Sequence, residues 1–401
     1  MMQDRRQLLK SLLVGAACAP WASLSVAAPQ STDNNRFVLI ILRGGMDGLT
    51  AVPAIGDPAF ADARGVLGQF ASAPLALDNS FALHPLLPQL HAMYGRGELA
   101  VLHAVGLPYR ERSHFDAQQV LESGGTRPHE ITSGWLGRAL ALAGGGPLSA
   151  VALETAVPLV LRGPTAVDSW APSALPEPAP DLVARLAQMY RQDPALAQAL
   201  ARAQGLRAQP GMAANPSMPG APGAYGGGRA AVALATKAAD FLQRGSRVAV
   251  MDLGGWDSHT NQMLPNGAMS NNLRTLDASL AALRDGLQPG GVWARTAVLV
   301  VTEFGREVVP NGNLGTDHGT GGVAFVLGGA VHGGRVLSDW PGLARKDRFE
   351  GRDLRITSDL RAAMRGLLSD HLRVPRAALD ALVLPGSASL GALDLLRQAA
   401  A

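Results

Sequence analysis

Phe37-Val-Leu-Ile-Ile-Leu42, followed directly by Arg43-Gly-Gly45, is the stretch that decides the fold class. Its six residues are continuously apolar and rich in β-branched side chains, which is typical of a strand buried on both faces of a sheet. The Arg-Gly-Gly triplet predicts a tight turn at the carboxyl end of this strand. The sequence therefore predicts a central strand that ends in a sharp loop.

Similar apolar runs recur along the chain and alternate with helical patterns. The further predicted strands are residues 99–105, 247–253, 296–302 and 323–327. Helical periodicity occupies residues 115–123, 271–287 and 354–372. This alternation predicts an α/β fold with a doubly wound, mostly parallel sheet and helices on both faces.

The segment near residues 208–228 differs in composition from the rest of the chain. It consists mainly of Gly, Pro and Ala and cannot bury enough apolar surface to order itself. We interpret it as a disordered insertion within a single α/β domain spanning residues 28–401, because the strands on its two sides are expected to join one sheet. An interdomain linker is the alternative interpretation.

Acids and imidazoles follow the ends of predicted strands, where functional groups gather in an open parallel sheet. Asp47 follows the first strand between glycines, although such a residue taken alone is more often part of a turn. Asp257 and His259 follow the strand at 247–253 and lie two residues apart, on the same side of an extended chain. An acid and an imidazole so placed suit a divalent metal; a structural His–Asp clasp is the alternative.

Another strand end and the loop beyond it carry more such groups. Glu303 and Arg306 follow the strand at 296–302, and Asp317 and His318 precede the next strand. Taken singly, Glu303 is explained as a helix-cap partner and His318 as a surface residue. Their coincidence at strand ends instead indicates one metal centre. Carboxylate and imidazole ligands suit zinc, manganese or iron, and a set richer in oxygen suits magnesium or calcium.

Ser113 and His114 stand at the predicted start of the helix at 115–123. Ser113 is placed to be its N-cap, and the free N–H groups of a first helical turn favour an anion such as phosphate or sulfate. A simple capping role is the alternative for Ser113.

The first 27 residues predict a removable export signal. Arg5 and Arg6 precede an apolar run, residues 11–19, that is too short to span a bilayer, and residues 25–27 fit a signal-peptidase site. The twin-arginine route carries folded cargo, so the mature protein is expected in the periplasm or secreted, with any metal loaded beforehand. A buried first helix and lipid anchoring at Cys18 are the alternatives.

Charge and cysteine content exclude several classes of protein. The formal charge is +3, of which the leader carries +2, so the mature chain shows no sign of nucleic-acid binding. Cys18 is the only cysteine and lies in the leader, which excludes a disulfide framework or a thiolate metal site after cleavage. No later stretch is long and apolar enough to form an integral membrane segment.

These motifs together resemble the domain-of-unknown-function 1501 family. The segments that carry the resemblance are LRGGMDG at 42–48, RSHF at 112–115, GWLGR at 134–138, GWDSH at 255–259, TEFGR at 302–306 and GTDHG at 315–319. The resemblance covers nearly the whole mature chain. The resemblance implies a twin-arginine leader and a fold of the alkaline phosphatase and sulfatase superfamily.

The resemblance also implies a set of site residues. In the superfamily, strand-end acids and histidines hold one or two metals beside a nucleophilic Ser or Thr at a helix start. The positions that match these ligands are Asp47, Asp257, His259, Glu303 and His318. Phe304 stands where a ligand histidine is usual, and His114 falls at the place of the nucleophile, with Ser113 beside it. In another register Asp317 pairs with His318, so Asp317 is also a candidate ligand.

Two hypotheses about function follow. The first is an exported metal-dependent hydrolase or transferase of a phosphate or sulfate ester, with Ser113 or His114 as nucleophile and Arg306 holding the anion. The second is a non-catalytic scaffold that binds a metal, a glycan or a partner protein. The expected partners are the twin-arginine export machinery and a small anionic ester or glycan.

Replacement of both Arg5 and Arg6 by lysine is expected to leave the precursor uncleaved in the cytoplasm, because paired arginines are the feature that the twin-arginine machinery recognises. Immunoblotting of cytoplasmic and periplasmic fractions measures this. Normal maturation of the double variant would contradict the assigned route.

Overall fold

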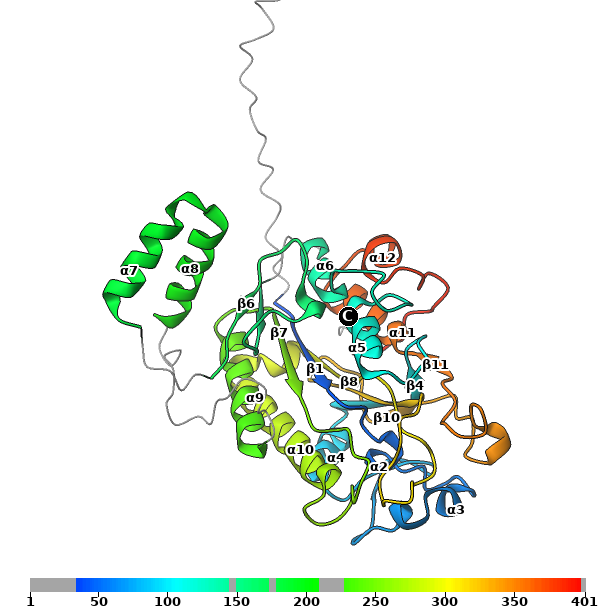
Figure 1. The fold of residues 1–401 in the computed structure, drawn as a ribbon. Coiled ribbons are helices and arrows are strands. Elements are labelled where there is room, and N and C mark those ends of the chain that lie inside the picture. The colour runs from blue at the N-terminus through cyan, green and yellow to red at the C-terminus, as the bar shows by residue number, and fades with distance from the viewer. Residues whose placement is uncertain (1–33, 144–148, 173–177, 209–226, 398–401) are drawn as a thin grey trace, which may run out of the picture.

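The computed structural model describes residues 34–143, 149–172, 178–208 and 227–397 (Figure 1). The predicted leader at residues 1–27 lies outside the described residues, as does nearly all of the Gly- and Pro-rich segment near 208–228.

One large sheet forms the centre of the described chain. Its nine strands are β1 (Arg36–Leu42), β4 (Leu99–Gly106), β5 (Ala150–Ala152), β6 (Asp168–Ser169), β7 (Val248–Leu253), β8 (Thr296–Thr302), β9 (Gly322–Leu327), β10 (Arg335–Leu337) and β11 (Ser358–Asp359). Their order is β10-β4-β9-β8-β1-β7-β5-β6, and β11 also pairs with β4. Strands from before and after the Gly- and Pro-rich segment therefore share one sheet. A separate two-stranded sheet joins β2 (Leu75–Ala76) to β3 (Ala82–Leu83).

The sheet is mostly parallel, as the sequence predicts. Strand β1 pairs in parallel with both β7 and β8, while β9 runs antiparallel to β8 and β4. A strand that runs in reverse begins at the edge where its neighbours end. The start of β9 therefore lies at the same edge as the carboxyl ends of β1, β7 and β8.

Helices cover both faces of the sheet (Figure 1). On one face lie α2 (Gly48–Ala51), α3 (Phe60–Arg64), α4 (Pro88–Gly95), α9 (Gly228–Gln243) and α10 (Ala268–Leu287); on the other lie α5 (His114–Ser123), α6 (Trp135–Leu142) and α11 (Leu360–Gly366). The hairpin of α7 (Pro180–Met189) and α8 (Pro194–Arg207) stands beside this body, and α12 (Arg376–Ala378) is near the carboxyl end. None of the described helices is long and apolar enough to cross a membrane.

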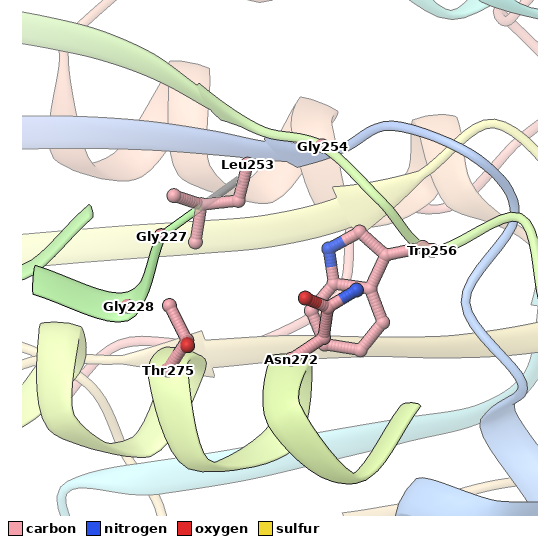
Figure 2. Close-up of a pocket in the computed structure, with 7 residues that line it drawn as sticks. All are labelled: Gly227, Gly228, Leu253, Gly254, Trp256, Asn272 and Thr275. Carbon is pink, nitrogen blue, oxygen red and sulfur yellow. The ribbon is translucent and has the colours of Figure 1, made fainter. Parts of the chain in front are cut away.

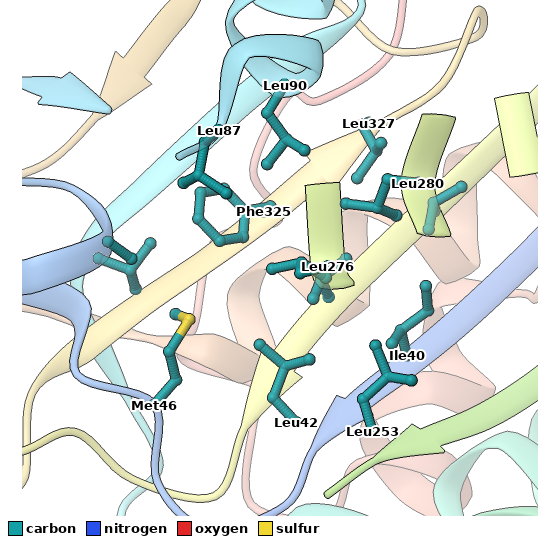
Figure 3. Close-up of a cluster of buried hydrophobic side chains, with 14 of the residues drawn as sticks. Ile40, Leu42, Met46, Leu87, Leu90, Leu253, Leu276, Leu280, Phe325 and Leu327 are labelled. Atoms are coloured by element: carbon teal, nitrogen blue, oxygen red, sulfur yellow. The ribbon is translucent and has the colours of Figure 1, made fainter. Parts of the chain in front are cut away.

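Side chains of β1 point alternately to the two faces of the sheet and so contribute to two separate core layers. Val38 and Ile40 point into the cluster under α9 and α10, which Figure 3 shows in part, whereas Leu39 and Ile41 point into the cluster under α5, α6 and α11. All seven residues of β1 are buried, which explains its uninterrupted apolar sequence. The fold class predicted from that sequence is confirmed.

One predicted helix begins later than expected. The pattern at 354–372 predicted a single helix, but residues Ser358–Asp359 form β11, and α11 begins at Leu360 and continues as a π-helical turn, Leu367–His371. Asp359 sets this start, because its side chain accepts the Arg361 N–H as an N-cap. The two polar residues of β11 are too few to interrupt the helical pattern, so periodicity alone did not reveal them.

Acid is expected to destabilise the fold through His103, a fully buried residue of β4 whose burial lowers its pKa to about 4. Its Nε2 donates to Val52 O at 2.9 Å and its Nδ1 accepts from Ala104 N at 2.8 Å, so only the neutral ring satisfies both contacts. Because the unfolded state binds the proton first, stability is full above about pH 6.5 and is lost as the pH falls toward 4, by up to roughly 3 kcal/mol.

Urea unfolding of the wild type and of His103→Gln across this pH range measures the effect. The variant should lose less stability between pH 6.5 and 4 than the wild type does. Equal losses in the two proteins would contradict the assignment.

Candidate functional site

Side chains from four parts of the chain meet at one edge of the sheet. Asp257 and His259 follow the end of β7, Glu303 follows β8, and His318 precedes the reversed strand β9. His114 is the first residue of α5. The structure therefore brings together five of the residues that the sequence singled out, although up to 204 positions separate those in direct contact.

Three imidazole rings converge through their Nε2 atoms. The Nε2 of His318 lies 3.1 Å from that of His114 and 3.1 Å from that of His259. The carboxylate of Asp257 completes the group, with oxygens 3.0 Å from His259 Nε2, 3.3 Å from His318 Nε2 and 3.5 Å from His114 Nε2. We call these four residues, His114, Asp257, His259 and His318, the imidazole cluster.

The Nδ1 of each imidazole ring, on the side away from the cluster centre, makes a hydrogen bond to an acceptor. His114 Nδ1 lies 2.8 Å from Glu303 Oε1, and His259 Nδ1 lies 2.8 Å from Asp317 Oδ1. His318 Nδ1 lies 3.0 Å from the carbonyl oxygen of Arg112. All three partners are acceptors, so each Nδ1 carries a proton and each neutral ring points its Nε2 lone pair into the cluster.

The imidazole cluster therefore contains four acceptors that face one another. Neutral Nε2 atoms have no proton to donate at 3.1 Å, and the Asp257 carboxylate adds negative charge. Four acceptors this close together repel one another unless a cation lies between them, either an extra proton or a metal ion. Imidazole rings whose second nitrogen is bound to a carboxylate or carbonyl are the usual arrangement of metal-ligating histidines.

The ionisation of the surrounding groups agrees with this arrangement. The hydrogen bond to Glu303 raises the pKa of His114, whereas burial lowers the pKa of His318. Burial alone would raise the pKa of Glu303, but the hydrogen bond from His114 is the first of several that outweigh it, and the net pKa is lowered. Hydrogen bonds from Asn311 and His259 lower the pKa of Asp317.

Arg306 lies beneath the imidazole cluster and is buried. Its Nε donates to Gly45 O at 2.7 Å and its Nη1 to Thr316 O at 2.9 Å. Its Nη2 donates to Gly44 O and to the Asp257 carboxylate. Burial alone would raise the pKa of Asp257, but the contact with Arg306 outweighs it and lowers that pKa.

Asp47 is held apart from the imidazole cluster by other partners. Its buried carboxylate accepts from Arg64 Nη2 at 2.6 Å, from Thr50 Oγ1 at 2.7 Å and from Gln262 Nε2 at 2.7 Å, and it caps α2. Burial would raise the pKa of Asp47, and the charge of Arg64 reverses that effect. An internal cation therefore already neutralises Asp47. Of the predicted ligands, Glu303 and Asp317 contact rings of the imidazole cluster from outside, whereas Asp47 pairs with Arg64, Thr50 and Gln262 instead.

Ser113 occupies the N-cap position of α5, as predicted, but its side chain makes no capping hydrogen bond. The hydroxyl of the nearby Tyr109 donates to Asp116 Oδ2 at 3.3 Å. The Ser113 hydroxyl therefore lies one residue from His114 and is not used as a helix cap.

Close backbone contacts explain the glycines around the site. Gly44 has φ of +119°, and a Cβ there would lie 2.4 Å from the backbone nitrogen of Asp257. A Cβ on Gly315 would lie 2.2 Å from the carbonyl carbon of His259. Both glycines allow loops to approach closely enough to place the cluster residues.

A small cavity lies beside the loop that carries Asp257 rather than at the imidazole cluster. Its volume is about 10 Å³, the size of one water, and Figure 2 shows Trp256, Asn272 and Thr275 around it. The buried indole Nε1 of Trp256 has no partner, and the Asn272 side chain donates to Gly255 O at 2.6 Å.

Several residues that shape the site carried no functional assignment from the sequence. Gln118 donates to Glu303 at 3.1 Å, and it follows His114 by four positions, so helical spacing could have revealed it. Arg112 directly precedes Ser113 but acts through its backbone carbonyl, for which side-chain chemistry gives no signal. Arg64 pairs with Asp47 only because α3 folds back over α2, which no local pattern indicates.

Comparison with solved structures finds distant similarity across most of the chain. The phosphonate monoester hydrolase of Agrobacterium radiobacter is 10% identical, with a TM-score of 0.42 over 85% of this chain and 74% of its own. A sulfatase from Pseudoalteromonas sp. is 12% identical, with a TM-score of 0.38 over 75% and 64%. An alkaline phosphatase superfamily protein from Vibrio parahaemolyticus is 12% identical, with a TM-score of 0.36 over 82% and 69%.

Because identities and TM-scores are this low, the chemistry of this chain must be argued from its own residues. No curated protein matches the chain significantly. The profile of the family described as "Protein of unknown function (DUF1501)" matches residues 92–374, which is more than half of the sequence and includes the imidazole cluster. This chain therefore belongs to the DUF1501 family.

Proposed function

We propose that the chain is an exported metal-dependent hydrolase or transferase acting on a phosphate or sulfate ester. The observation that carries the proposal lies at the carboxyl edge of the sheet, where ligand atoms of His114, Asp257 and His318 all lie within 4.8 Å of one another. His259 adjoins this group, with its Nε2 3.1 Å from that of His318. The paired arginines and short apolar run of the leader support export.

The ligand set favours a borderline transition metal. The proposed ligands are His114, His259, His318 and Asp257, which supply three nitrogens and one oxygen. Imidazole nitrogens suit zinc or iron better than they suit magnesium or calcium, which prefer oxygen. Glu303 and Asp317 are then outer partners that orient the rings, rather than the direct ligands suggested by their positions in the sequence.

Residues beside the proposed metal site can supply a nucleophile for ester cleavage. A bound divalent cation supplies positive charge that polarises a phosphoryl or sulfuryl oxygen. Ser113 is the proposed nucleophile, because it stands beside His114 at the start of α5 and its hydroxyl is not used as a cap. The Nδ1 of His114 is held by Glu303 and its Nε2 faces the cluster, so we assign His114 as a ligand instead of a nucleophile.

One observation favours the second hypothesis, a non-catalytic scaffold that binds a metal or a glycan. The guanidinium of Arg306 is fully buried and its hydrogen bonds go to backbone carbonyls and Asp257. Because the Arg306 side chain is 0% exposed, it is not presented to a substrate anion at the surface of the site. Activity assays separate the two hypotheses.

The mature protein is expected to bind a single Zn²⁺, and His318→Ala should weaken that binding by roughly 100-fold or more, since it removes a direct ligand. Elemental analysis and zinc titration measure this. His332→Ala is the matched control, because His332 is exposed and lies outside the imidazole cluster. Unchanged zinc binding by His318→Ala would refute the proposed centre.

The zinc-loaded protein should hydrolyse 4-nitrophenyl phosphate or 4-nitrophenyl sulfate. Ser113→Ala should lose this activity while keeping its zinc. Zinc binding without turnover of either ester would favour the scaffold hypothesis.

Arg306→Lys is expected to lower the free energy of unfolding by roughly 2–4 kcal/mol, because an ammonium group cannot reach all the carbonyls that the guanidinium satisfies. Urea denaturation measures this, and Arg376→Lys, at a side chain that is 70% exposed, should change stability by about 0.5 kcal/mol or less. A fully stable Arg306→Lys protein with a raised KM would instead assign Arg306 to substrate binding.

A further inference from the structure

Arg112 has an unusual backbone conformation next to the imidazole cluster. Its φ is 61°, in the left-handed region that residues with a side chain rarely adopt. Its carbonyl oxygen accepts the Nδ1–H of His318, and the residues that follow are Ser113 and His114 at the start of α5. Such strain persists only where the surrounding structure holds it. Whatever holds Arg112 therefore also fixes two rings of the cluster.

The turn at residues 349–353 holds the side chain of Arg112. The guanidinium Nε donates to Asp353 Oδ2 at 2.8 Å, and Nη2 donates to Glu350 Oε2 at 2.5 Å. The ring of Phe349 lies 5.9 Å from the guanidinium carbon. Asp353 is fully buried, whereas the side chain of Glu350 is 57% exposed, so Asp353 makes the contact that solvent screens least.

The same turn holds the backbone of His318. Arg352 Nη2 donates to the carbonyl oxygen of His318 at 2.8 Å, and its Nε lies 2.9 Å from Glu307 Oε2. His318 is thus tethered twice from one turn, directly through Arg352 and through its ring by way of Arg112. The turn itself is closed by a hydrogen bond from Phe349 N to Asp353 O at 2.9 Å.

We propose that Asp353 is a positioning residue for the imidazole cluster. It holds Arg112 in the left-handed conformation, which aims the Arg112 carbonyl at His318 Nδ1 and sets the first residue of α5. The effect on metal binding rests on the proposed function. Loss of an outer partner of a metal-ligating histidine typically weakens metal affinity by about 10- to 100-fold.

Zinc titrations of Asp353→Asn, Arg112→Gly and the double variant test the proposal. Glycine adopts positive φ at no cost, so Arg112→Gly removes the side-chain contacts with Asp353 and Glu350 but still allows the left-handed backbone conformation. Each single variant should bind Zn²⁺ about 10- to 100-fold more weakly, and the double variant should add less than about twofold, because both changes break one connection. Fully additive losses, or unchanged affinity in folded Asp353→Asn, would overturn the proposal.

Asp359→Asn is the matched control. Asp359 caps α11 and pairs with Arg361 at 2.8 Å, so its loss should lower stability while leaving zinc affinity unchanged. If Asp359→Asn weakened zinc binding as much as Asp353→Asn did, the effect would be one of general stability and the proposal would fail. Should Asp353→Asn not fold, Arg112→Lys, which keeps the charge and loses the forked geometry, takes its place.

Nitrogen NMR of histidine-labelled, metal-free protein gives a readout that does not depend on zinc. His318 should carry its proton on Nδ1 in the wild type, and Asp353→Asn should shift it toward a mixture of tautomers. An unchanged tautomer in Asp353→Asn would contradict positioning. If the wild type binds no zinc, the proposed function fails, and the tautomer alone then decides whether Asp353 positions His318.

Discussion

The buried guanidinium of Arg306 is the interaction on which the rest of the site depends. It joins the Gly44–Gly45 turn after β1, the carboxylate of Asp257 after β7 and the carbonyl of Thr316 in the loop before β9. A guanidinium suits this place because it stays charged and presents five donors in one plane. Its burial is costly unless those donors are satisfied, so the loops must close around it together.

The imidazole cluster uses the two nitrogens of each ring for different purposes. The Nδ1 atoms bind acceptors on three separate segments, namely Glu303, Asp317 and the backbone of Arg112. The Nε2 atoms are left to face one another and Asp257. Because the outer hydrogen bonds keep the protons on Nδ1, the Nε2 lone pairs and the Asp257 carboxylate face one another and require a positive charge between them. This gives a member of a family of unknown function a specific chemistry that can be tested.

The sequence predicted the framework of the site because each part of that framework has a local signal. Uninterrupted apolar runs revealed β1 and β8, and residues just beyond such runs, including Asp257 and Glu303, were predicted to meet. The role of each residue at this edge of the sheet could not be predicted, because it depends on contacts with distant segments. Whether Arg306 points to solvent or under the loops depends on Gly44 and Thr316, which lie on other segments. Asp47 pairs with Arg64 for a similar reason, and this contact exists only after α3 has packed.

X-ray absorption spectroscopy of the zinc-loaded mature protein tests the central claim most directly. The imidazole cluster predicts a zinc shell of nitrogen and oxygen at about 2.0–2.2 Å, with the outer-shell scattering of three imidazole rings. A shell of oxygen alone, or one with a single imidazole, would contradict the assignment of His114, His259 and His318 as ligands.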